Sequence, residues 1–209
     1  MAKIIAFSGK EAGIPDHELR KVLSRPKNYE VRSREYLRAD EVERLMKAAA
    51  QVGRHRLRDR TLILTAFRHG LRVSELIGLK WAQVDFRYAQ LHVNRLKSGL
   101  ASVHPIEGDE LRLLRRLRRQ YFDSAFVFTT ERGGPLSRST VGKLLRRAGD
   151  RAGIEYPVHP HMLRHGTGYY LANRGVPTRT IQAYLGHRSI QNTVRYTQLS
   201  SAAFDGLWG

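Results

Sequence analysis

Residues 159–165 read His159-Pro160-His161-Met162-Leu163-Arg164-His165, and this stretch decides the fold of the C-terminal part of the chain. His161 and Arg164 lie three residues apart, so on a helix both side chains share one face. An imidazole and a guanidinium that point to a common position suit the binding of one phosphate. The stretch therefore predicts a helix that carries half of an anion site.

The other half is predicted further along the chain. Leu185-Gly186-His187 ends an apolar segment, and Ser189 can cap a new helix. Tyr196 falls near the end of that helix, so a second imidazole and a phenol are expected to converge on the same site. A tyrosine beside several cations is a plausible nucleophile.

The composition indicates a polyanionic partner. The 209 residues hold 37 Lys and Arg against 19 Asp and Glu, a formal net charge of +18. This exceeds what a solvated surface needs. Ribosomal or histone-like proteins are also basic, often with few hydrophobic residues, but 41% hydrophobic residues are enough to bury an ordinary core. The chain is predicted to be a globular nucleic-acid binder.

The absence of cysteine excludes a disulfide framework, a thiolate metal site and a cysteine nucleophile. The opening run Ile4-Ile5-Ala6-Phe7 is too short for a signal peptide, and no stretch approaches the roughly 20 apolar residues of a membrane span. These features predict a cytoplasmic protein.

Hydrophobic spacing predicts the elements. Residues 1–36 form an N-terminal arm with at most one short helix, at 16–23. Helices are expected from Ala39, around 62–67 with Gly70 at the end, and at 74–79. Strands are expected at 81–85, 90–95 and 101–106, with a turn at Ser98-Gly99.

A helix at 109–121, a strand at 125–128 and a helix at 137–151 follow, and the chain is helical from there to 197. Residues 198–209 form a C-terminal tail, which could fold back or dock into a neighbouring protomer. The expected fold class is mainly α with a small antiparallel β-sheet.

Together these residues resemble the tyrosine site-specific recombinases and phage-type integrases. Arg72-Val73-Ser74-Glu75-Leu76 resembles the family's first arginine box, Lys97 its β-hairpin lysine, and residues 161–165 its second box. Leu185-Gly186-His187 with Tyr196 completes the set. The resemblance spans about 36–197 and implies a catalytic domain of that fold over 37–197.

Within the family, the chain is most similar to small bacterial recombinases that invert the promoter switch of fimbrial genes. It shares the run 159–165, Leu171-Ala172-Asn173 and the lack of a full N-terminal core-binding domain. The same chemistry also serves integration, excision and dimer resolution. One departure is Gly166-Thr167-Gly168-Tyr169, where relatives commonly carry a bulkier segment and where two glycines disfavour a regular helix.

The chemistry follows from the residue types. Arg72 and Arg164, planar and always charged, suit the charge on the non-bridging oxygens of a phosphodiester transition state. Neighbouring cations favour the phenolate of Tyr196. Tyr196 is then expected to attack DNA and to hold it through a 3′ phosphotyrosyl bond.

The remaining site residues have assisting roles. The resemblance implies that Lys97 is the general acid for the 5′ oxygen, with Arg95 as a nearby competitor. His161 could accept the phenol proton, and His187 would donate a hydrogen bond to the phosphate. Glu75 could orient Arg72 or His161.

Cations on two predicted helices are candidates for DNA contact. We expect such contact from Arg95 and from four residues at 137–151, where the helix N-terminus also attracts phosphate: Arg138, Lys143, Arg146 and Arg147. For five arginines at 109–121, a solvated face opposite a leucine stripe is as plausible as DNA contact: Arg112, Arg115, Arg116, Arg118 and Arg119.

The expected partner is double-stranded DNA, and the resemblance implies a homotetramer on paired sites. Accessory DNA-bending proteins are a further expectation, because the arm is too short to close a clamp around the duplex. No metal, nucleotide cofactor or membrane is expected, and the setting is the nucleoid. Two alternatives stay open: a DNA-binding regulator that retains the fold without cutting, and a topoisomerase-like activity that nicks and reseals.

Overall fold

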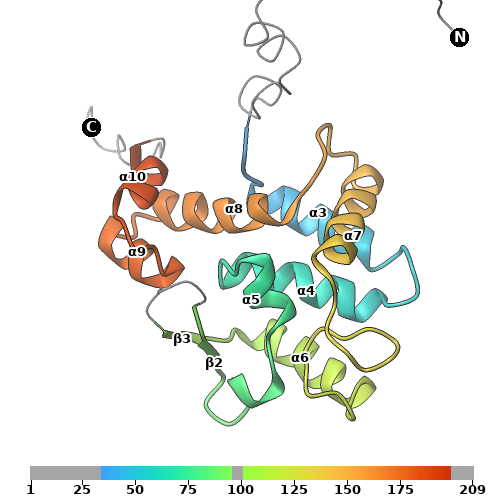
Figure 1. The fold of residues 1–209 in the computed structure, drawn as a ribbon. Coiled ribbons are helices and arrows are strands. Elements are labelled where there is room, and N and C mark those ends of the chain that lie inside the picture. The colour runs from blue at the N-terminus through green and yellow to red at the C-terminus, as the bar shows by residue number, and fades with distance from the viewer. Residues whose placement is uncertain (1–33, 96–100, 199–209) are drawn as a thin grey trace, which may run out of the picture. The chain divides into compact units, whose positions relative to one another are not determined.

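The computed structural model describes residues 34–95 and 101–198, and from Glu35 onward they belong to one compact unit (Figure 1). The expected helix at 16–23 and the turn at Ser98-Gly99 lie outside these residues. The elements, in chain order, are α3 (Ala39–Ala49), α4 (Arg56–Arg68), α5 (Val73–Ile77), the 3₁₀ helix η1 (Trp81–Gln83), β1 (Val84–Asp85), β2 (Gln90–Val93), β3 (Ser102–Pro105), α6 (Gly108–Gln120), α7 (Arg138–Arg151), α8 (Pro160–Asn173), α9 (Thr178–Leu185) and α10 (Gln191–Gln198).

Helix α4 is the centre of the main core. It buries apolar side chains around its circumference, among them Leu62, Ile63, Leu64 and Ala66, and a helix that is apolar on all sides requires cover on all sides. Helices α3, α6 and α8 supply that cover. The helix predicted around 62–67 is therefore longer than expected and begins at Arg56.

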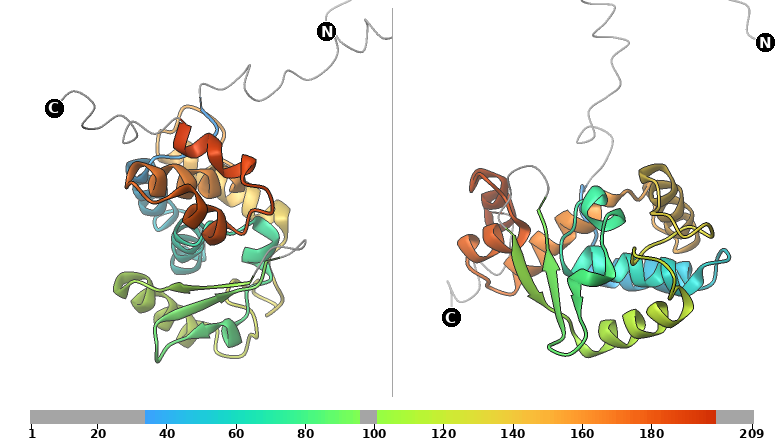
Figure 2. Two further views of the ribbon diagram at one scale, coloured as in Figure 1. Left: turned by 90° about the vertical axis from the view of Figure 1, so that its left-hand side faces the viewer. Right: turned by 60° about the horizontal axis from the view of Figure 1, so that its bottom comes forward.

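The sheet is small and antiparallel, in the order β1-β2-β3, with Val84 opposite Leu91 and Leu91 opposite His104. Figure 2 shows it as a separate layer, and one strand, β3, reaches α9. The strand expected at 81–85 is instead a 3₁₀ turn followed by two paired residues.

The strand prediction at 125–128 is wrong, since Phe126 makes only a single bridge, to Lys80. The main-chain hydrogen bonds of residues 125–128 go to two different segments of the chain, so no continuous ladder with one partner strand forms. Val127 donates to the Leu79 carbonyl, whereas the Phe128 carbonyl already accepts from the main chain of Leu136.

The C-terminal part is three helices, separated near Gly175 and Gly186, whose backbones are left-handed with φ of +73° and +63°. Figure 1 shows α9 and α10 gathered at the C-terminal end of α8. They enclose a second, smaller apolar cluster with these buried members: Ala172, Ile181, Leu185 and Tyr196. The expected fold class, mainly α with a small antiparallel sheet, is confirmed.

Residues 34–95 and 101–198 contain neither a candidate membrane span nor a candidate metal site. No helix within them has both the length and the apolar character to cross a membrane. Between residues 34 and 95 and between 101 and 198, no group of three or more His, Cys, Asp or Glu side chains is arranged to hold a metal ion.

Candidate active site

Helix α8 carries the first pair of site residues. It begins with Pro160 at a position where the missing N–H costs nothing, so His161 and Arg164 fall on its first turns. His161 is exposed, whereas Arg164 is 4% exposed. The Arg164 guanidinium donates to the Gly70 carbonyl and, at 2.7 Å, to the Leu185 carbonyl. Arg164 thus joins α8 to the turn before α5 and to the end of α9.

Arg72 stands at the start of α5. The chain reaches it through Gly70, whose left-handed backbone (φ +55°) turns the chain after α4. Arg72 Nη1 lies 2.8 Å from one carboxylate oxygen of Glu75, and its main-chain nitrogen lies 2.9 Å from the other. The Arg72 side chain remains 28% exposed, so it is open on one side.

Glu75 bridges two arginines, because Arg95 Nη1 also donates to it at 2.9 Å. Burial alone would raise the pKa of Glu75, but the hydrogen bonds from Arg72 and the charge of Arg95 outweigh burial and lower it. The structure therefore places this predicted supporting residue beside Arg72.

Arg95 occupies a different position from the one we expected. It is 7% exposed, and besides Glu75 its guanidinium donates to the main-chain carbonyls of His69 and Tyr184. A DNA contact requires an accessible guanidinium, whereas this one is enclosed, so its placement favours positioning of Glu75. Lys97, the predicted general acid, lies outside the described residues.

His187 follows the left-handed Gly186 that ends α9. Its Nδ1 lies 2.8 Å from the hydroxyl of Thr193, a buried residue on α10. Burial, followed by the charges of Arg164 and Arg72, lowers the pKa of His187 to about 3. The imidazole is consequently neutral at physiological pH.

Tyr196 is fully buried within the second cluster. Its ring centroid lies 5.1 Å from that of Tyr169 in an edge-on contact and 6.1 Å from that of His187. Its hydroxyl lies 2.8 Å from Nδ1 of His165, and Arg195 donates to it at 3.4 Å. Tyr169 in turn packs on Tyr36, with 3.9 Å between the ring centroids.

Four of the predicted catalytic residues come together around Arg164: Arg72, His161, His187 and Tyr196. Burial, then Arg72 and Arg95, lower the pKa of Arg164 to about 9, and Tyr196 is close enough to oppose that shift. Partial desolvation, Arg164 and Arg72 lower the pKa of His161. Two guanidiniums, two imidazoles and a phenol therefore share one electropositive site. Such a group of fixed donors can bind a phosphodiester and stabilise charge on its oxygens.

His165 was not predicted from the sequence as a site residue. It is the imidazole partner of the Tyr196 hydroxyl, although only His161 was expected to serve the phenol. The signal was present, since His165 follows His161 by four residues and a helix places such pairs on one face. Their ring centroids lie 6.3 Å apart.

The predicted DNA-contacting cations on α7 are all exposed: Arg138, Lys143, Arg146 and Arg147. Ser137 caps this helix by accepting from the Thr140 main-chain nitrogen at 3.0 Å. Helix α7 packs against α5 and α8, the two helices that carry the site arginines. The α7 cations thus lie on an element adjoining the site.

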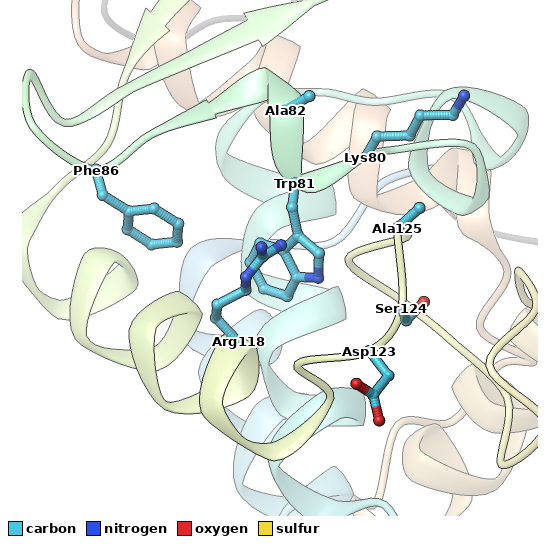
Figure 3. A pocket seen from close by; sticks show the side chains of 8 residues that line it. All are labelled: Lys80, Trp81, Ala82, Phe86, Arg118, Asp123, Ser124 and Ala125. Carbon is cyan, nitrogen blue, oxygen red and sulfur yellow. The ribbon is translucent and has the colours of Figure 1, made fainter.

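A cavity of about 630 Å³ lies elsewhere, between η1, the end of α6 and residues 123–125 (Figure 3). Arg118 lies over the Trp81 ring, 5.1 Å from its centroid, and Arg115 donates to the Phe86 carbonyl. The predicted catalytic residues do not line this cavity. At least two of the α6 arginines are therefore engaged in packing around the sheet.

The chain is similar to known proteins over most of its length. The sequence profile described as the phage integrase family matches residues 35–202. The type 1 fimbriae regulatory protein FimE of Escherichia coli (strain K12) is 42% identical over 181 residues, which is 84% of this chain and 91% of FimE. The tyrosine recombinase XerA of Pyrococcus furiosus is 35% identical over 169 residues, 79% of this chain and 57% of XerA.

A solved structure has the same fold. The XerH site-specific recombinase bound to its difH substrate superposes with a TM-score of 0.68 at 21% identity, over 78% of this chain and 50% of XerH. At this identity the likeness concerns the fold alone.

Proposed function

Because the chain belongs to the phage integrase family and is a tyrosine recombinase, we propose that Tyr196 is its nucleophile and that the residues around Arg164 bind the scissile phosphate of DNA. The observation that carries this proposal is the convergence of Arg72, both predicted histidines and Tyr196 around Arg164, with His187 in ring contact with Tyr196. A protein that only bound DNA would have no need of a buried phenol among them.

In the proposed reaction, Tyr196 Oη attacks the phosphorus and the bond from phosphorus to the 5′ oxygen breaks. Arg72 and Arg164 stabilise the charge on the non-bridging oxygens, and His161 and His187 add hydrogen bonds. The phenol gives its proton to His161, the proposed base, and the 5′ oxygen gains one from Lys97, the proposed general acid. Attack by a 5′ hydroxyl reverses the step, and the phosphotyrosine ester conserves the bond energy, so strand exchange needs no nucleotide.

The binding partner is DNA. The oligomeric state on DNA and the accessory proteins are part of the proposal. We propose a homotetramer on paired sites, assisted by DNA-bending proteins, within the nucleoid of the cytoplasm. The 42% identity to a fimbriae regulatory protein supports inversion of a DNA segment as the outcome of exchange.

The α7 cations are proposed to contact DNA phosphates, because they are exposed on a helix that packs against α5 and α8. Replacing Lys143 and Arg146 together by alanine is expected to weaken binding and to reduce the slope of log affinity against log salt by about 1.8, or about 0.9 for each lost phosphate contact. Fluorescence anisotropy at several salt concentrations measures this slope. A matched pair on α6, Arg116→Ala with Arg119→Ala, is expected to leave it unchanged, and the reverse pattern would contradict the assignment.

Cleavage is tested with a nicked duplex that carries a site recovered by binding selection from random sequences. A nick next to the scissile bond makes the released fragment, which carries the free 5′ hydroxyl, short enough to diffuse away. The covalent intermediate therefore accumulates, and denaturing electrophoresis resolves it. If the protein binds the duplex but forms no adduct with the nick on either strand, the result would favour a DNA-binding regulator that does not cut. Relaxation of supercoiled plasmid without a site would favour a topoisomerase-like activity.

Inversion is tested on a plasmid that carries two sites in inverted orientation, where a restriction digest reports the orientation of the segment between them.

A further inference from the structure

Gly168, in the middle of α8, has the Tyr196 ring directly against its backbone. A Cβ built on Gly168 would lie 2.6 Å from Cδ2, 2.6 Å from Cε2 and 2.7 Å from Cζ of that ring. Real Cβ atoms do not approach this closely, so the ring occupies the space that any other residue would fill. Glycine is a poor residue for a helix interior, and yet α8 continues through Gly168 without a break.

His165 lies three residues before Gly168, on the same face of α8, and its Nδ1 forms the 2.8 Å hydrogen bond with the Tyr196 hydroxyl. Burial, then the charge of Arg195, lowers the pKa of His165 to about 3, so the imidazole stays neutral and the hydrogen bond persists at physiological pH. One residue therefore makes room for the ring and a second one fixes the hydroxyl.

We propose that Gly168 and His165 form a seat on α8 that holds Tyr196 of the same chain in its cleavage position. Both are positioning residues, because they act through Tyr196. The cleavage position is favoured over a remote resting position, since the seated phenol already lies beside His187 and interacts with Arg164. The proposal rests on the proposed function.

Substitution of Gly168 by alanine tests the seat. The added methyl group displaces the ring, and a misplacement of about 1 Å lowers the rate by about 100-fold, so Gly168→Ala is expected to form adduct on the nicked duplex at least about 100-fold more slowly. The matched control is Gly142→Ala on α7, where a Cβ meets nothing within 4 Å and cleavage should not change.

A second substrate distinguishes an effect on the position of Tyr196 from an effect on the phosphate-binding residues. An oligonucleotide that ends in a 3′ p-nitrophenyl phosphate already carries a phenolic leaving group in place of Tyr196. Attack by the 5′ hydroxyl of the adjoining strand forms the phosphodiester and releases p-nitrophenol. This ligation needs the phosphate-binding residues but not the phenol, so Gly168→Ala should retain it within about threefold.

His165 is tested in the same two assays. His165→Leu should lose cleavage and retain nitrophenyl ligation, and His165→Asn, which can again bond the hydroxyl, should recover most of the cleavage. Equal loss of both reactions in Gly168→Ala would reduce the seat to a structural part of α8 and overturn the proposal, as would cleavage at the wild-type rate. If the wild-type protein performs neither reaction on a site that it binds, the proposed function itself fails.

Discussion

Replacement of Tyr196 by phenylalanine is expected to abolish the covalent adduct, with a loss of at least about 10⁴-fold in cleavage. Phenylalanine keeps the ring in place over Gly168 and removes only the oxygen that is proposed to attack the phosphate. The fold loses two hydrogen bonds of the hydroxyl, one with His165 and a longer one from Arg195, each worth about 1 kcal/mol. DNA binding and thermal unfolding should therefore stay close to those of the wild type.

Neighbouring tyrosines are poor substitutes for the nucleophile. Burial raises the pKa of Tyr184 to about 12, and its hydroxyl donates to the Arg68 carbonyl at 2.9 Å. Burial also raises the pKa of Tyr169. The nicked-duplex assay measures the loss, with Tyr170→Phe as the control, because Tyr170 is an exposed residue whose hydroxyl bonds only Arg174 among the contacts described. An adduct that persists in Tyr196→Phe would remove Tyr196 from its assigned role.

Replacement of Arg164 by lysine is expected to lower cleavage by about 10³-fold and to lower the melting temperature as well. Arg164 donates to two main-chain carbonyls, of Gly70 and Leu185, and its remaining N–H groups are the ones proposed to bind the phosphate. A single ammonium cannot serve all three positions. Both the adduct and nitrophenyl ligation should fall together, because the loss concerns the phosphate.

Single-turnover cleavage and thermal unfolding check these two effects. Arg174→Lys is the matched control, since Arg174 is exposed near the end of the same helix, outside the site. Unchanged stability in Arg164→Lys would show that the two carbonyl contacts contribute little, and unchanged cleavage would separate Arg164 from the phosphate.

The sequence predicted helices best where a capping residue is followed by apolar residues at helical spacing. Helix α7 was predicted within one residue at its start, because Ser137 caps it and its apolar residues recur at helical spacing. Helix α4 was predicted too short, since it starts at Arg56 without a side-chain cap and its first turn is mostly charged. The strand at 125–128 was wrong because alternation along one segment says nothing about whether a partner strand runs beside it.

The site was predicted as a set of residues, and the structure adds how they are supported. Arg95 was expected on the DNA surface, but a charge count cannot distinguish an exposed arginine from one that is paired with a buried Glu75. Gly168 appeared in the sequence as a residue that disfavours a helix. Its purpose depends on Tyr196, 28 residues later, and only a structure brings the two together.

The ring contacts that run from Tyr36 through Tyr169 to Tyr196 have a practical consequence for truncation. A shortened chain that starts at Leu37 would keep every described helix and strand and would lose the outermost ring of this series, which ends at the proposed nucleophile. Expression boundaries chosen from secondary structure alone would thus remove a ring contact that leads to the proposed nucleophile, and a fragment for cleavage assays should begin no later than Tyr36.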